Sequence, residues 1–82
     1  GTLIWPNPTT DEFEINFSDS PGSLVIEIYT SSGSLIFRKD FTDYAGHNIA
    51  LQALSGKPQG IYLIKLKTGK GTFVSKIIKF ND

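Results

Sequence analysis

Residues 60–67 read Gly60-Ile61-Tyr62-Leu63-Ile64-Lys65-Leu66-Lys67, and the chain returns at residues 72–80 with Thr72-Phe73-Val74-Ser75-Lys76-Ile77-Ile78-Lys79-Phe80. The first stretch is apolar for four residues after its glycine and then alternates lysine with leucine, which is typical of a strand that passes from a core toward solvent. The linking residues Thr68-Gly69-Lys70-Gly71 form a short polar loop with two glycines that can adopt positive φ. The two stretches therefore predict a β-hairpin, in which alternation turns Tyr62, Ile64 and Leu66 inward.

The rest of the chain contains five more stretches with the pattern of short strands. In residues 12–18 and 23–30 every second residue is apolar, so each stretch has one buried face and one wet face. Residues 2–5, 34–41 and 47–51 have a shorter or more ambiguous pattern. No segment shows an apolar period of 3.6 residues, so no helix longer than a turn is expected. The sequence thus predicts an all-β fold, a seven-stranded antiparallel Ig-like β-sandwich with no significant helix.

Alternation also predicts which side chains form the core. We expect the following residues to face inward: Phe13, Ile15, Phe17, Leu24, Ile26, Ile28, Ile49 and Leu51, with Leu54 as a plug. In residues 34–41 the two faces compete, and we expect Leu35, Phe37 and Phe41 to be the inward set. Trp5 precedes a rigid corner, Pro6-Asn7-Pro8, and is expected to cap the core beside it. A solvent-facing Trp5 that stacks on sugars is the alternative.

Composition narrows the classes of function. A chain of 82 residues has room for one domain, and its eight basic and eight acidic side chains cancel, so charge gives no case for binding nucleic acid or an anionic membrane. The absence of cysteine excludes thiol catalysis and zinc–thiolate sites. Apolar runs reach only four residues, far short of a bilayer span. The abrupt start at Gly1, without a signal-peptide pattern, is what we expect of a piece of a longer protein.

No pattern in the sequence assembles catalytic chemistry. The single histidine, His47, is expected on the surface at the start of a strand. Asp11, Glu12 and Glu14 lack the glycine-bearing loop spacing of a calcium site and are better explained as a solvated face. Residues 69–71, Gly-Lys-Gly, link two strands rather than a strand and a helix, so they predict a hairpin turn and not a phosphate loop. We therefore expect a domain that is not an enzyme and needs no cofactor or metal.

Four motifs, in order, resemble those of a known family. Residues 5–10, Trp-Pro-Asn-Pro-Thr-Thr, are similar to its opening motif, and residues 27–36 are similar to its central hairpin. Residues 54–66 resemble its Leu-x-x-Gly-x-Tyr-apolar signature, although Lys57-Pro58-Gln59 lengthens the approach, and residues 75–79 resemble its terminal basic–apolar strand. The family is the C-terminal sorting domain of the type IX secretion system (the Por secretion tail) of Bacteroidota. The residues that carry the motifs are Pro6, Asn7, Pro8, Thr9 and Gly33.

The resemblance implies a sorting signal without catalysis. Residues 1–82 would be a single C-terminal sorting domain from a larger secreted protein. The cargo would cross the periplasm and pass through the outer-membrane translocon to the cell surface or the medium. A sortase-like peptidase would then remove the domain. The implied partners are translocon and sortase-like components, with no nucleic acid and no small-molecule substrate, and exposed strand edges leave room for a weak homodimer.

The hypothesis for recognition places it between Gly60 and Asp82, above all on the last strand, with Lys76, Lys79 and the terminal residues accessible. The predicted recognition residues are Gly60, Tyr62, Lys65, Lys67, Lys76, Ile77, Ile78 and Lys79. One alternative is a carbohydrate-binding or adhesive module of a surface enzyme, which requires exposed aromatic side chains such as Trp5, Tyr29 and Tyr44 in one plane. Another alternative is an inert spacer of the fibronectin type, whose deletion would leave export unchanged.

Overall fold

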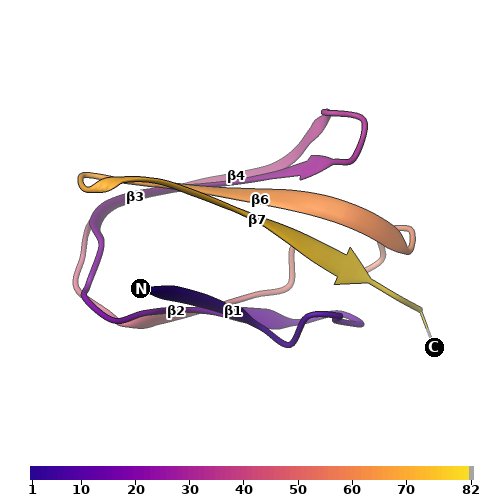
Figure 1. Ribbon diagram of the computed structural model, residues 1–82, viewed down its shortest axis with the longest axis horizontal. Helices are drawn as coiled ribbons and strands as arrows, with labels where there is room; N and C mark the ends of the chain where they lie inside the picture. Colours follow the sequence, from indigo (N-terminus) through magenta and orange to yellow (C-terminus); the bar gives the residue numbers. More distant parts are fainter. Residues whose placement is uncertain (82) are drawn as a thin grey trace.

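A computed structural model describes residues 1–81 and contains seven β-strands and no helix. The strands are β1 (Thr2–Trp5), β2 (Phe13–Phe17), β3 (Gly22–Thr30), β4 (Leu35–Tyr44), β5 (Asn48–Leu51), β6 (Gly60–Thr68) and β7 (Gly71–Lys79). They form two sheets, stacked as two layers (Figure 1). The prediction of an all-β antiparallel sandwich is confirmed. Since residues 1–81 contain no helix, none of them provides a helical membrane span.

The smaller sheet has the order β1-β2-β5 and the larger one has the order β4-β3-β6-β7. Every pair of neighbouring strands is antiparallel. The predicted hairpin is β6–β7, whose register runs from Gly60 opposite Lys79 to Thr68 opposite Gly71, so Gly69 and Lys70 form the turn. Strand β6 lies inside the larger sheet between β3 and β7, whereas β7 lies at its edge.

The core lies between the two sheets and is built by alternation. The buried apolar residues of β2, β3, β5 and β6 lie at every second position, because successive side chains of a strand point to opposite faces. Leu54, in the loop between β5 and β6, is fully buried. All of the core residues expected from these patterns are buried: Phe13, Ile15, Phe17, Leu24, Ile26, Ile28, Ile49, Leu51, Leu54, Tyr62, Ile64 and Leu66.

The prediction that Leu35 faces inward is wrong. Its side chain is 50% exposed, while Phe37 and Phe41 pack against the core as expected. The register of β3 and β4 shifts between Ile28, which lies opposite Phe37, and Tyr29, which lies opposite Leu35. Tyr29 lies on the outer face of the sheet. Because the shift of register pairs Leu35 with Tyr29, the Leu35 side chain also lies on the outer face.

The prediction that Trp5 caps the core is also wrong, because Trp5 is 47% exposed. In β1 the residue that faces the core is Ile4, so its neighbours Leu3 and Trp5 must point away from it. Trp5 lies opposite Glu14 on the outer face of the smaller sheet. The strand prediction was right, and the choice of its buried face was wrong.

Candidate recognition surface at the C-terminal strand

The predicted recognition residues divide between the two faces of the larger sheet. Lys65, Lys67, Lys76 and Ile78 lie on its outer face, whereas Tyr62, Ile77 and Lys79 are buried on its inner face. Gly60 is exposed at the start of β6, opposite Lys79. Since side chains alternate along β6 and β7, no single face of this hairpin can present all of these residues to a partner. Gly60 and the outer-face members therefore keep accessible surface in the folded domain, whereas Tyr62, Ile77 and Lys79 do not.

The expectation that Lys79 is accessible is wrong, because its side chain is on the buried face and only 3% of the residue is exposed. The Lys79 ammonium donates hydrogen bonds to the carbonyl oxygen of Lys57 at 2.9 Å and to Oδ1 of Asn81 at 2.8 Å. The alkyl part of the Lys79 side chain thus packs on the buried face, and the hydrogen bonds of its ammonium group link the loop before β6 to the last strand. Asp82, the last residue of the predicted surface, lies outside the described residues.

The outer face of β6 and β7 carries an apolar patch with lysines beside it. Its apolar members are exposed in the folded domain, and cross-strand pairs place Leu63 opposite Lys76 and Lys65 opposite Val74. The Lys65 ammonium lies 5.9 Å from the centre of the Tyr29 ring, a cation–π contact. In residues 1–81, no carboxylate lies within 4.0 Å of the Lys65 or Lys76 ammonium. We name this surface the outer-face patch, made of Ile61, Leu63, Lys65, Val74, Lys76 and Ile78.

A buried carboxylate lies next to the outer-face patch. Glu27 of β3 has a side chain that is only 6% exposed. Its Oε1 accepts a hydrogen bond from the Tyr29 hydroxyl at 2.9 Å and lies 3.2 Å from the Lys67 ammonium, and its Oε2 lies 3.3 Å from Nη1 of Arg38. The hydrogen bond from Tyr29 lowers the pKa of Glu27, and Lys67 and Arg38 lower it further against the opposing effect of burial. Glu27 thereby joins β3, β4 and β6 on their outer face.

Stability should depend on pH through Glu27. Its pKa in the folded domain is below its ordinary value, so the unfolded chain binds a proton more readily. This contribution is therefore fully present above about pH 4.5 and is lost as pH falls through the folded-state pKa. Urea unfolding of the wild type and of Glu27→Gln between pH 7 and pH 3 measures it. The wild type should lose its advantage over the variant on acidification, while Asp11→Asn, at an exposed carboxylate, should follow the wild type. A constant difference between wild type and Glu27→Gln would contradict the prediction.

The opening motif and the terminal strand motif meet in the structure. Asn7 Nδ2 donates to the carbonyl oxygen of Lys76 at 2.7 Å, and Asn7 Oδ1 accepts from the Ile78 N–H at 2.9 Å. The Thr9 N–H donates to the Ile78 carbonyl oxygen at 2.9 Å, and the Phe80 N–H donates to the Thr9 carbonyl oxygen at 3.0 Å. The side-chain amide of Asn7 therefore pairs with the edge of β7 as a neighbouring strand would. We name these contacts the terminal clasp.

The terminal clasp could not be deduced from the sequence. Its partners Asn7 and Lys76 are 69 residues apart, and Asn7 and Ile78 are 71 apart. Asparagine between two prolines indicates a turn, and nothing local says which backbone its side chain meets. The structure thus gives a physical reason for two of the motifs: Asn7 and Thr9 close the edge of β7 from Lys76 onward.

Replacing Asn7 by alanine should lower the free energy of unfolding by about 1–2 kcal/mol, because two hydrogen bonds of about 0.5–1.5 kcal/mol each are lost at a partly solvated site. Amide hydrogen exchange should also become faster at Ile78, whose N–H loses its acceptor. Asn7→Asp should keep the acceptor for that N–H and lose only the donor to Lys76. The idea of a clasp would be wrong if Ile78 kept its protection in Asn7→Ala.

The remaining motif residue, Gly33, lies in the turn between β3 and β4 at φ 96°, which L side chains rarely adopt. Its N–H donates to the Thr30 carbonyl oxygen at 2.9 Å, and the Thr30 N–H donates to the Ser34 carbonyl oxygen at 2.8 Å. Glycine is thus required by the backbone of the turn, and its role is to shape the hairpin.

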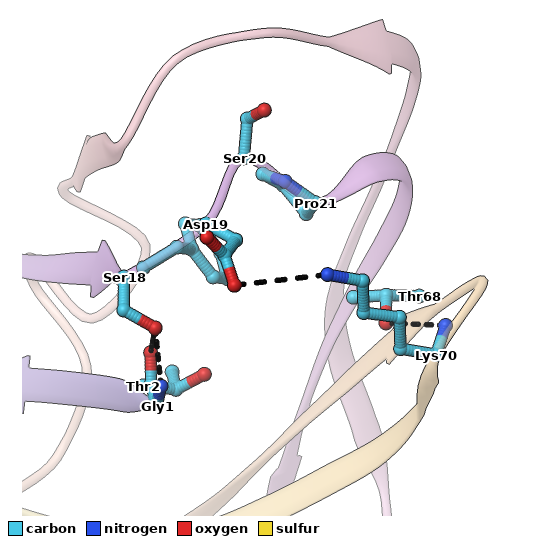
Figure 2. A pocket seen from close by; sticks show the side chains of 9 residues that line it. Gly1, Thr2, Ser18, Asp19, Ser20, Pro21, Thr68 and Lys70 are labelled. Atoms are coloured by element: carbon cyan, nitrogen blue, oxygen red, sulfur yellow. Dashed lines mark hydrogen bonds and ion pairs between the residues drawn. The ribbon is translucent and has the colours of Figure 1, made fainter.

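A depression lies at one end of the sandwich, where the loop between β2 and β3 approaches the β6–β7 turn (Figure 2). Figure 2 shows Asp19 facing Lys70, with 3.8 Å between Oδ2 and Nζ, and Ser18 bonded to Gly1. Asp19 and Lys70 are both largely exposed, so their attraction is screened by water. His47 is exposed, with Nδ1 3.2 Å from the carbonyl oxygen of Phe17, one of the residues that line the depression.

The aromatic plane needed for sugar binding is not formed by the residues named for it. Trp5 lies on the outer face of the smaller sheet, and Tyr29 lies on the outer face of the larger sheet. Tyr44 packs edge-on against Phe41, with 5.1 Å between ring centres, and its hydroxyl donates to the Asn48 carbonyl oxygen at 2.6 Å. The three rings therefore face in different directions, and no single flat ligand could contact all of them.

Comparisons with known proteins identify a family and a solved structure of similar fold. The family model described as "Secretion system C-terminal sorting domain" matches residues 3–80. No curated protein matches the chain. Among solved structures, the crystal structure of CopC from Methylosinus trichosporium OB3b is similar, with a TM-score of 0.58 and 17% sequence identity over 100% of this chain and 94% of that one. At this identity the likeness shows a shared fold alone.

Proposed function

The chain belongs to the family of secretion system C-terminal sorting domains, and from this membership we propose how it directs a protein out of the cell. It is a C-terminal sorting signal of the type IX secretion system, a family of domains that do not catalyse reactions. In our proposal the domain folds while its cargo is in the periplasm. The outer-membrane translocon then recognises the outer-face patch, and a sortase-like peptidase cuts the chain ahead of β1.

The observation that supports recognition at the outer-face patch is the kind of side chains that it exposes. Lys65, Lys76 and Ile78 are the members of the predicted recognition set that lie in it, and all three come from the C-terminal hairpin. Apolar side chains are exposed beside the Lys65 and Lys76 ammonium groups, and neither group has a carboxylate of residues 1–81 within 4.0 Å. Such a surface favours a partner that buries the apolar residues and supplies negative charge. The other family motifs shape the domain, through the terminal clasp and the Gly33 turn.

The test is an export assay with surface substitutions. The domain, with its natural upstream linker, is fused to a fluorescent cargo that carries a signal peptide, in a host with the type IX machinery. A deletion of residues 75–82 is unsuitable because it removes the buried Ile77 and Lys79. We use the double variant Lys76→Glu/Ile78→Ser, which alters exposed side chains of β7. Its matched control is Lys39→Glu/Leu35→Ser, which makes the same charge reversal and an equivalent aliphatic-to-serine change at exposed residues of β4.

We expect the wild-type fusion and the β4 control to reach the cell surface or medium, and the β7 variant to accumulate in the periplasm. Thermal unfolding of the purified domains verifies that both variants are folded. Export of the β7 variant at the wild-type level would overturn recognition through the outer-face patch. Retention of the wild-type fusion would overturn the proposed route itself. Equal retention of both variants would show that the patch has no special role.

A further inference from the structure

Half of the edge of β7 is uncovered. Both the N–H and the carbonyl of Ile78 point away from β6, since they bond to Asn7 and Thr9. Because this direction alternates along an antiparallel strand, the backbone groups of Lys76, Val74 and Thr72 also point away from β6. The terminal clasp covers the edge from the Lys76 carbonyl onward. Within residues 1–81, the outward N–H groups of Thr72, Val74 and Lys76 have no hydrogen-bond acceptor.

The opposite edge of the larger sheet differs from this one. Strand β4 pairs with β3 through two shifts of register, and its exposed middle contains both signs of charge in Arg38, Lys39 and Asp40. Irregular register and mixed charge hinder the addition of a further strand. The pairing of β7 with β6 is continuous over all nine residues, from Gly71 to Lys79. Of the two edges, β7 therefore offers the regular template.

The two sides of the uncovered edge have different chemistry. On the inner side, Phe73 is partly exposed and lines a depression with Thr2, Phe17 and Leu66, between the edges of β1 and β7, which Figure 1 shows on the same side of the molecule. On the outer side, Val74 is 56% exposed and lies between the cations of Lys65 and Lys76 in the outer-face patch. A strand added here would need apolar side chains facing in and acidic side chains facing out.

We propose that the edge of β7 from Thr72 to Lys76 binds an extended segment of a partner protein, in which apolar and acidic residues alternate, by adding it to the larger sheet as a fifth strand. This inference rests on the proposed function, since the partner would be a component of the export machinery that reads the same hairpin. The terminal clasp marks the end of the site, because Asn7 occupies the position of the added strand beyond Lys76. A second copy of this chain fits poorly: the ionisable residues of β7 are all lysines, so two copies would bring like charges together.

A proline at Val74 tests the backbone part of the site. Val74→Pro removes an outward N–H that β6 does not use, and prolines are tolerated at such positions of edge strands. Val74→Thr is the matched control, since it keeps both the shape of the side chain and the N–H. The probe is a capped nine-residue peptide in which valine and glutamate alternate, and its counterpart alternates valine and lysine. Binding to the whole 82-residue chain is followed by the amide NMR signals.

In the wild-type chain, the glutamate peptide should shift the amide signals of Thr72, Val74 and Lys76 and slow their hydrogen exchange. Val74→Pro should bind it about tenfold more weakly or worse, while Val74→Thr stays within about twofold, because only the proline loses a strand hydrogen bond and places a ring at the edge. The lysine peptide should bind at least about tenfold more weakly than the glutamate peptide. Absence of shifts with the glutamate peptide, equal binding of both peptides, or shifts centred on β4 would overturn the proposal. Dimerisation that Val74→Pro abolishes, without peptide binding, would assign the edge to a second copy and also overturn it.

Export of Val74→Pro separates this proposal from the function on which it rests. If the wild-type and Val74→Thr fusions are exported and the Val74→Pro fusion is retained, the edge proposal and the sorting function are both supported. If Val74→Pro is folded and exported as well as the wild type, the edge proposal is wrong and the sorting function stands. If the wild-type fusion itself is retained, the proposed route fails, and the peptide measurements still decide whether the edge binds an acidic strand.

Discussion

Replacing Ile77 by alanine is expected to lower the free energy of unfolding by about 2–5 kcal/mol, the usual cost of removing a buried isoleucine side chain down to its Cβ. Ile77 has no exposed surface and lies opposite the buried Tyr62 in the last strand. A chain of 82 residues has a total stability of about 4–12 kcal/mol. The substitution therefore removes a large part of it, and a fraction of the variant should be unfolded at 37 °C.

The neighbouring residue gives a matched control for this measurement. Ile78 is 38% exposed on the outer face, so Ile78→Ala should change the free energy of unfolding by no more than about 1 kcal/mol. Urea unfolding followed by the change in β-sheet circular dichroism compares the two. Equal losses from the two alanine substitutions would mean that the faces of β7 are assigned incorrectly.

Replacing Lys79 by alanine should be the second most damaging change, with a loss of about 2–4 kcal/mol from the buried alkyl stem and the charge-assisted hydrogen bonds together. The ammonium bonds to the Lys57 carbonyl oxygen and to Asn81, so its removal also releases the loop before β6. Lys79→Met keeps most of the stem and loses the charge. Its stability should lie between those of the wild type and Lys79→Ala.

Lys76, three residues earlier and on the outer face, is the matched control, and Lys76→Ala should lie within about 0.5 kcal/mol of the wild type. Thermal unfolding at equal protein concentration measures all four chains. If Lys76→Ala and Lys79→Ala were equally stable, the burial of Lys79 would be refuted. If Lys79→Met were as unstable as Lys79→Ala, the hydrogen bonds rather than the stem would account for the loss.

These two expectations change how truncations of such a domain should be interpreted. A deletion that reaches into β7 removes core residues along with any surface that a translocon reads. A failure of export would then follow from unfolding alone. Point substitutions on the outer face, at Lys76, Ile78 or Val74, leave the buried face intact and separate stability from recognition.

The number and kind of the strands and most of the core residues could be predicted from the sequence. Alternation is a local property, since the side chains of one strand point to opposite faces whatever lies beside it. Strands with one apolar face, such as residues 13–17, therefore revealed their buried side directly. The tight β6–β7 turn and the glycine at position 33 were also readable, because turn chemistry depends on adjacent residues.

Features that depend on residues distant in the sequence became visible in the folded domain. Leu35 is exposed because β4 pairs with β3 through an irregular register, and Trp5 is exposed because Ile4 is the residue that meets the core. Lys79 is buried because the loop before β6 covers its side of the sheet, and Asn7 closes the edge of a strand about 70 residues away. None of these contacts has a local signal, since a side chain or backbone group finds its partner only when the sheets are assembled. The same assembly leaves half of the β7 edge uncovered, and so decides where a partner strand could be added.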